Sequence, residues 1–172
     1  MSTDATAWAD IVWRGQPVQL EYRWLAPERQ DAPLLIFLHE GLGSVAMWKN
    51  FPQQLCEALG VQGLMYSRPG YGQSSPREPS EQWQPDFMHR QAHEVLPALL
   101  QALQVDEAPW LFGHSDGGSI ALLYATRHAC AGVIVLAPHI MVEDVSVKSI
   151  AMAKEAYENT ALRERLARYH DD

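Results

Sequence analysis

The sequence predicts an α/β protein, a three-layer sandwich in which helices cover both faces of a mostly parallel sheet. Short apolar runs without polar alternation, at 34–38 and 132–137, are typical of strands buried on both faces of a parallel sheet. From residue 33 onward such runs alternate with stretches of helical periodicity, the order that builds parallel βαβ units. In the run 110–125 an apolar strand, a glycine-flanked turn and an apolar helix follow one another directly.

The strands come first in the chain and then alternate with helices. Strands are predicted at 7–13, 18–25, 34–38, 63–66, 109–114 and 132–137. Residues 14–17 join the first two strands as a hairpin connection, whereas 26–33 form a polar loop with two prolines. The last strand, 132–137, is apolar throughout and is expected to be fully buried.

The helices are predicted from apolar faces and from the residues that end them. Helices are predicted at 47–59, 87–103, 116–128, 145–158 and 161–169. Gly60 ends the first, and Pro97 should kink the second. A long loop rich in Gly, Ser and Pro spans 67–85. Because no strand separates the last two helices, we divide the chain into a core at 1–139 and a helical region at 140–172.

Composition limits the classes of function. With 172 residues, 47% hydrophobic and 20% charged, the chain is long enough for one globular domain with a real core. No apolar run approaches the ~20 residues that span a bilayer, and residues 1–6 do not resemble a signal peptide. A net charge of −8 argues against nucleic-acid or membrane partners. Cys56 and Cys130 are not in metal spacing and suit packing in a reducing, cytoplasmic compartment.

Ser115 lies in the pattern Gly113-His114-Ser115-Asp116-Gly117, which reads G-x-S-x-G. A serine at a tight strand-to-helix turn is held in a strained backbone region that lifts its hydroxyl above the sheet. The residues two before and two after must be small, or strand and helix collide, and both are glycine. The backbone N–H of Asp116 then lies at a helix N-terminus, where it can stabilise an oxyanion. The alternative is a glycine-rich turn with an incidental serine.

Two further loops follow predicted strands and should lie near this serine. The loop 39–44 can present a backbone N–H from Gly41 or Leu42 opposite that of Asp116, which would complete an oxyanion hole. The loop 67–74 is glycine-rich and leaves the carboxyl end of a strand, where open α/β folds bind ligands. Taken singly, either loop could be an ordinary turn.

Together these motifs resemble the α/β-hydrolase family. Residues 113–117 resemble its nucleophile elbow, and 39–44 its H-G-x-x-G-S oxyanion loop, with Glu40 in place of the first glycine. Residues 67–74 resemble D-x-P-G-x-G-x-S, with Ser67 in place of aspartate. The resemblance covers residues 8–140 and is nearest to the branch of esterases, proline iminopeptidases and C–C bond hydrolases. In that branch a helical cap follows the sixth strand, so 140–172 are expected to begin a cap.

The resemblance implies a strand order of 1-2-4-3-5-6-7-8 and a triad of Ser, then an acid, then His. Strands seven and eight are missing, so we expect the chain to be the N-terminal part of a hydrolase, with the triad acid and histidine beyond Asp172. His139 lies near the active edge without an obvious orienting acid, and His114 should diverge from its neighbour Ser115. Glu143 and Asp144 occupy an alternative acid position that some relatives use. His39 is expected to support the oxyanion loop through its ring.

The leading hypothesis is a hydrolase of small esters, thioesters or amides. Ser115 would attack the carbonyl, the N–H groups of Asp116 and Gly41 would hold the oxyanion, and Leu42, His114 and His139 would contact the substrate. The alternative is an inactive fragment or a binding module on the same fold. Without a general base, we expect esterase activity near background.

No cofactor is expected. No metal is expected either, because the histidines at 89 and 93 lack a third ligand. The strand from Val133 to Ala137 would have one bare edge, which a second copy or the helices from 145 to 169 would cover; we favour a homodimer.

Overall fold

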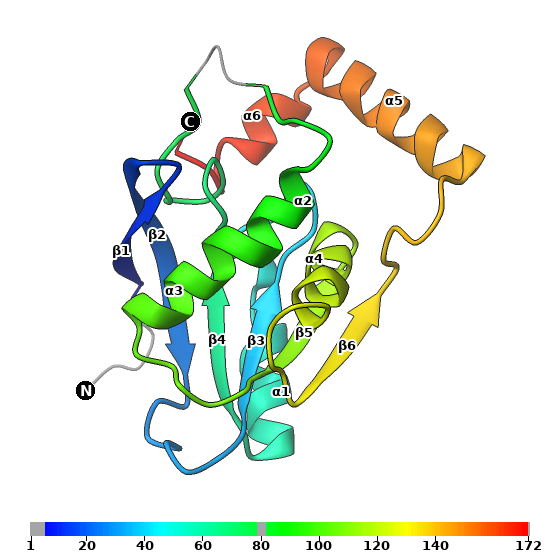
Figure 1. Ribbon diagram of the computed structural model, residues 1–172. Coiled ribbons are helices and arrows are strands. Elements are labelled where there is room, and N and C mark those ends of the chain that lie inside the picture. The colour runs from blue at the N-terminus through cyan, green and yellow to red at the C-terminus, as the bar shows by residue number, and fades with distance from the viewer. Residues whose placement is uncertain (1–5, 79–81, 172) are drawn as a thin grey trace.

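The computed structural model describes residues 6–78 and 82–171 and contains a six-stranded sheet in the order β1-β2-β4-β3-β5-β6 (Figure 1). The strands are β1 (Ala7–Trp13), β2 (Gln16–Leu25), β3 (Leu34–Leu38), β4 (Gln62–Tyr66), β5 (Trp110–His114) and β6 (Gly132–Leu136). The first two strands are antiparallel to their neighbours, whereas β4, β3, β5 and β6 are parallel. The α/β class and the predicted order of the first six strands are therefore confirmed. The prediction that residues 1–6 are not a signal peptide falls on a segment of which the structure describes only Thr6.

The register of the parallel strands brings three loops to one edge of the sheet. Phe37 on β3 pairs with Met65 on β4 and with Phe112 on β5. Strands β3, β4 and β5 therefore end within a residue or two of each other. The loops that follow them, 39–44, 67–74 and the turn at Ser115, leave from that common edge.

Helices cover both faces of the sheet, as the three-layer prediction requires (Figure 1). They are α1 (Phe51–Leu59), α2 (Phe87–Arg90), η2 (Gln91–Val95), α3 (Leu96–Ala102) and α4 (Asp116–Ala125), with a short 3-10 turn η1 (Ala46–Trp48) before α1. Buried residues of η2, α3 and α4 pack with β1 and with one face of the central strands, in a core that includes Leu99, Ile120 and Leu64. The opposite face packs Phe37 and Phe112 against Cys56 of α1. The apolar faces therefore dictate the layers.

The helix predicted at 87–103 was expected to kink at Pro97, and the structure has a π turn just before it instead. It runs through α2, η2 and α3, and η2 is one turn of π-helix that ends just before Leu96 and Pro97. Proline lacks an N–H and its ring crowds the carbonyl four residues earlier, here that of His93. A π turn widens the backbone at that point and is a usual way to absorb such a defect.

Strand β6 is not fully buried, so that prediction is wrong. Every residue of β6 is exposed at least in part, and Ile134 and Leu136 are 39% and 48% exposed. Only Val133 and Val135 pack against the core. The physical reason is position: β6 pairs with β5 alone among the described strands, so it is an edge strand.

Two helices follow β6 and lie beyond the carboxyl edge of the sheet. They are α5 (Asp144–Asn159) and α6 (Leu162–Leu166), and neither has a buried residue. Figure 1 shows α5 standing past the end of β6, not alongside its edge. No helix among the described residues is long and apolar enough to cross a membrane.

Candidate active site

Ser115 lies between β5 and α4 in a strained backbone conformation, with φ 52° and ψ −116°. Positive φ is unusual for a residue with a Cβ and is a recurrent feature of functional turns. A Cβ at Gly113 would collide with the backbone of Gly117, and a Cβ at Gly117 would collide with the carbonyl of Leu38. The structure thus requires glycine at both positions that the sequence analysis named. The Ser115 N–H donates to the carbonyl of Leu136, at the end of β6, over 2.8 Å.

His139, which the sequence placed only near the active edge, reaches Ser115 itself. Its Nε2 lies 3.1 Å from Ser115 Oγ. Two features direct the chain there after β6. Ala137 has a φ of 48°, which turns the backbone back, and the His139 N–H donates to Ser119 Oγ at 2.8 Å. A left-handed alanine carries no sequence signal comparable to glycine, so this turn could not be predicted.

Asp116 contacts the same ring nitrogen of His139 as Ser115 does. Its Oδ1 lies 3.2 Å from Nε2, so the carboxylate and the serine hydroxyl both face one ring atom. In a Ser-His-Asp triad the acid instead binds the other ring nitrogen and fixes the tautomer. Among the described residues no carboxylate contacts His139 Nδ1. Glu143 and Asp144, the alternative acids, are exposed and do not contact His139.

The loop 39–44 lies against Asp116, as an oxyanion hole would need. A Cβ placed on Gly41 would lie 3.1 Å from Asp116 Oδ2. The N–H of Gly43 donates to the carbonyl of Glu40 at 3.1 Å, which closes a turn around Gly41 and Leu42. Both candidate N–H donors therefore lie on a defined turn next to the start of α4.

His39 supports this loop through both ring nitrogens. Nδ1 lies 2.7 Å from the Glu40 carbonyl, and Nε2 accepts the backbone N–H of Arg68 at 3.1 Å. Burial, together with the nearby Arg68 cation, holds the pKa of His39 well below 6.5. The ring is neutral at pH 7, with its proton on Nδ1. This is the supporting role expected from the sequence.

Arg68 is a buried cation that the motif analysis did not single out. Its side chain is 2% exposed, and its guanidinium donates to the carbonyls of His39 at 2.7 Å and Glu40 at 3.0 Å. Nη2 also lies 3.7 Å from Asp116 Oδ2, and the guanidinium lies over the ring of Tyr71 at 4.8 Å. The one sequence signal for this role was an arginine inside a glycine-rich loop.

Glu21 explains the serine at position 67. Its buried carboxylate Oε2 accepts the Ser67 hydroxyl at 2.7 Å and the N–H of Gln73 at 2.9 Å. Ser67 Oγ in turn accepts the N–H of Val45 at 2.9 Å. A carboxylate from β2 thus binds the glycine-rich loop where the motif would have its own aspartate. Glu21 belongs to a strand far from the motif in sequence, so the motif alone could not reveal it.

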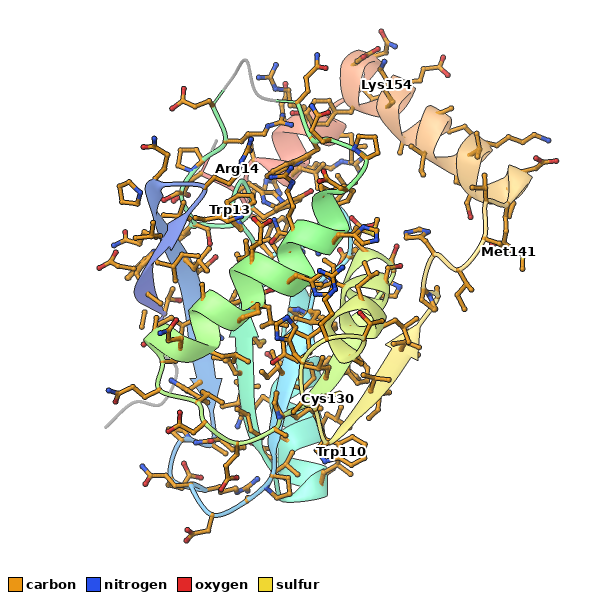
Figure 2. The ribbon with its side chains drawn as sticks, in the orientation of Figure 1. Trp13, Arg14, Trp110, Cys130, Met141 and Lys154 are labelled. Atoms are coloured by element: carbon orange, nitrogen blue, oxygen red, sulfur yellow. The ribbon has the colours of Figure 1, made fainter. Side chains whose placement is uncertain are left out.

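A cavity of about 600 Å³ opens beside the site, between the core and α5. It is lined by Gly41, Leu42, Asp116 and His139 from the core side, Phe87 and Met88 from α2, Ile150, Ala153, Lys154 and Tyr157 from α5, and Leu162 from α6. Most of these side chains are apolar. Lys154 lies toward the end of α5 that leads to α6 (Figure 2), and its amine pairs with Glu158 at 3.9 Å.

The side chains of several other residues make no contact with those of Ser115, Asp116 and His139 in the described part of the chain. His114 is exposed, and its side chain makes no hydrogen bond, ion pair or ring contact within the described residues. Cys130 and Trp110 lie at the opposite end of the sheet (Figure 2). Cys56 is buried, which raises the pKa of its thiol to about 11. The part of the chain that the structure describes holds no cluster of three or more His, Cys, Asp or Glu able to bind a metal.

His170 connects the end of the described chain to both loops. Its Nδ1 accepts the N–H of Gly72 at 2.9 Å, so Nε2 carries the proton and donates to the Leu42 carbonyl at 3.1 Å. The N–H of Asp171 donates to the Gly72 carbonyl at 2.9 Å. The segment after α6 therefore binds the loops that flank the site, which no sequence pattern indicated.

Comparison with known families decides the relationship. A model of the alpha/beta hydrolase fold family matches residues 33–165. The chain belongs to the alpha/beta hydrolase family. The match confirms the resemblance seen in the elbow and loop motifs. None of the curated protein sequences searched matches this member of the family.

Solved structures share the alpha/beta hydrolase fold with this chain. They include a carboxylesterase from Nitrososphaera gargenis, with 18% identity over 92% of this chain and 56% of that one and a TM-score of 0.70. A thermophilic esterase from Thermogutta terrifontis has 17% identity over 90% and 54%, with a TM-score of 0.66. A protein described as a probable hydrolytic enzyme, from Pseudomonas aeruginosa, has 24% identity over 84% and 44%, with a TM-score of 0.66. The chain spans about half the length of these structures.

Proposed function

We propose that this protein is a serine hydrolase that cleaves an ester, thioester or amide of a small acyl substrate, with Ser115 as the nucleophile. The observation that carries the proposal is the 3.1 Å contact between Ser115 Oγ and His139 Nε2 at a positive-φ elbow. A nucleophile within hydrogen-bond reach of a base is the arrangement that nucleophilic catalysis needs. The family membership and the esterases among the similar structures support the same reaction class.

In the proposed reaction His139 is the general base. Ser115 Oγ attacks the substrate carbonyl while its proton moves to His139 Nε2, and the carbonyl oxygen becomes an oxyanion. The carbonyl then re-forms as the bond to the leaving group breaks, the leaving group takes the proton from His139, and an acyl ester remains on Ser115. Water next attacks this ester with its proton passing to His139, and cleavage of the bond to Ser115 Oγ releases the acid and returns the proton to the serine. Asp116 Oδ1, 3.2 Å from Nε2, stabilises the positive charge on the ring once it holds the proton.

Two backbone N–H groups are proposed to hold the oxyanion. One is that of Asp116, in the first turn of α4, and the other is that of Gly41 or Leu42 on the adjacent turn. Loss of one such donor costs ~3–4 kcal/mol of transition-state stabilisation in a well-studied protease. Leu42 and His139 also line the cavity, so they are proposed to contact substrate.

The cavity suggests which substrates fit. At about 600 Å³ it falls within the range of small-molecule sites, roughly 300–1,000 Å³. Its lining from α2, α5 and α6 is largely apolar, which favours an uncharged acyl or alcohol group. We propose that residues 140–172 begin a cap whose α5 closes this side of the site.

A second candidate function is binding without turnover. It is favoured by the shared use of His139 Nε2, because an Nε2–H bonded to Asp116 leaves no lone pair for the serine proton. In that state the cavity would hold an acyl ligand and Ser115 would remain protonated. The two candidates differ in the reactivity of Ser115, not in the fold.

Labelling of Ser115 by a fluorophosphonate probe separates the candidates. Wild type should label at one site, and Ser115→Ala should abolish labelling and the hydrolysis of nitrophenyl butyrate. Loss of a triad serine costs on the order of 10⁶ in rate in subtilisin. His139→Gln should slow labelling at least about 100-fold, the usual scale of a general base. His114→Gln, an exposed neighbour in the same turn, is the matched control.

The outcomes are exclusive. Labelling that needs both Ser115 and His139 supports the hydrolase. An unlabelled wild type that still binds nitrophenyl butyrate points to the binding module. Labelling that persists in His139→Gln contradicts His139 as the base, and a folded Ser115→Ala variant that hydrolyses the ester contradicts Ser115 as the nucleophile.

A further inference from the structure

Arg68 is nearly removed from solvent, and the polar contacts of its guanidinium all concern the site. The side chain is 2% exposed, and Nη1 and Nη2 donate to the carbonyls of His39 and Glu40 at 2.7 and 3.0 Å. Nη2 lies 3.7 Å from Asp116 Oδ2, while Nε is buried without a hydrogen-bond partner. A buried donor without a partner is costly, so the hydrogen bonds of Arg68 come with a penalty. The charge that Arg68 places beside Asp116 is therefore the feature to explain.

Asp116 creates an electrostatic problem at the proposed oxyanion hole. Its side chain is only 14% exposed, and Oδ2 lies 3.1 Å from where a Cβ on Gly41 would be. An oxyanion held by the N–H groups of Asp116 and Gly41 or Leu42 would form close to this carboxylate. Two negative charges in a poorly solvated site repel each other, which opposes the reaction.

We propose that Arg68 is a positioning residue that offsets the charge of Asp116 and fixes the oxyanion loop beside it. The inference rests on the proposed function of Ser115. The cation lies on the Oδ2 side of the carboxylate, away from His139, so Oδ1 remains available to the protonated ring. The same guanidinium binds two successive carbonyls of the loop, and the second of them, that of Glu40, belongs to the peptide unit whose N–H is that of Gly41, one of the proposed donors.

The charge role and a purely structural role make different predictions in a double-mutant cycle. If Arg68 offsets Asp116, its cation is needed only while Asp116 is an anion. Arg68→Met should then slow fluorophosphonate labelling of Ser115 roughly 10- to 100-fold in the wild-type background. In the Asp116→Asn background the same substitution should slow labelling less than about threefold.

The control is Arg29, another arginine that donates to two backbone carbonyls. Its Nη1 binds Cys56 at 2.9 Å and Val61 at 3.3 Å, on the α1 side of the sheet and away from the site. Arg29→Met should leave the labelling rate unchanged. Thermal unfolding of every variant confirms that the rates come from folded protein.

Arg68→Lys keeps the test valid if Arg68→Met does not fold. Lysine preserves the charge and loses the planar fork, so we expect labelling within about tenfold of wild type. Equal losses with and without the Asp116→Asn substitution, or a folded Arg68→Met that labels at the wild-type rate, would overturn the inference. Failure of the proposed function is distinct, because wild type itself would then not label at Ser115.

Discussion

At the scale of single residues, the proposed chemistry depends on which ring nitrogen of His139 carries the proton. Ser115 Oγ and Asp116 Oδ1 lie almost equally far from this nitrogen, at 3.1 and 3.2 Å. With the proton on Nε2 the ring donates toward Asp116. With the proton on Nδ1 the ring can accept from Ser115, with the carboxylate facing its lone pair. The tautomer of His139 therefore decides whether Ser115 has a base.

His39 makes acid sensitivity a prediction at the same scale. Burial and the Arg68 cation lower its pKa well below 6.5, so the unfolded chain binds this proton more readily than the folded one. The stabilising contribution is complete above pH 6.5 and is lost as the pH falls toward the folded pKa. We expect the free energy of unfolding to fall between pH 7 and pH 5, with the loss beginning near pH 6.5.

Urea unfolding at a series of pH values measures this slope. His39→Asn cannot titrate and should flatten the slope below pH 6.5, even if the variant is less stable overall. His114→Asn replaces an exposed histidine and should keep the wild-type slope. A wild-type slope in His39→Asn would show that the acid sensitivity has another origin.

At the scale of elements, β2 supplies the anion that holds the glycine-rich loop. Glu21→Ala removes an acceptor of two short hydrogen bonds, from Ser67 and from the backbone of Gln73. Leaving these donors unpaired in a buried setting should cost about 2–3 kcal/mol of stability, measured by urea unfolding. Adding Ser67→Asp to this variant returns a carboxylate to the loop and should recover at least about half of that loss.

Glu28 offers the control for this exchange. It lies just past β2 with a side chain 66% exposed, so Glu28→Ala should change stability by less than about 0.5 kcal/mol. If Ser67→Asp destabilises the Glu21→Ala variant further, the two carboxylates are not interchangeable and Glu21 does not stand in for the aspartate of the motif.

The elements were largely predictable, whereas the contacts between distant residues were not. Apolar runs predicted the six strands of the described sheet, and the G-x-S-x-G motif predicted the elbow glycines, because both signals are local in sequence. The π turn that ends at Val95 and the return of His139 to Ser115, which needs a positive φ at Ala137, depend on backbone angles. The residue types alanine and valine do not indicate such angles in a sequence. Glu21 and Arg68 contact partners that are distant in sequence, Ser67 and Asp116. A short sequence motif cannot reveal such pairs.

At the scale of the whole molecule, β6 is an open edge of the sheet that the described strands form. Ile134 and Leu136 are 39% and 48% exposed, and Figure 1 places α5 beyond the strand rather than along it. An exposed apolar edge strand is a template for pairing with another chain. We therefore predict a two-fold dimer at micromolar concentration, measured by sedimentation velocity.

A charge on this edge should prevent the pairing. Ile134→Lys should sediment as a monomer with an unchanged fold. Val12→Lys is the matched control, because Val12 is 74% exposed on β1, the edge strand at the other side of the sheet. A wild type that stays monomeric as its concentration rises would contradict the dimer.

Strand β6 also contacts Ser115, the proposed nucleophile. Its last residue, Leu136, accepts the N–H of Ser115 at 2.8 Å, and the chain that leaves it reaches His139 three residues later. Any strand that paired with the outer edge of β6 would stiffen an element that is connected both to Ser115 and to the segment that carries His139. Dimer formation through β6 would then affect the geometry of the proposed site. The turnover of each chain would in that case depend on the protein concentration.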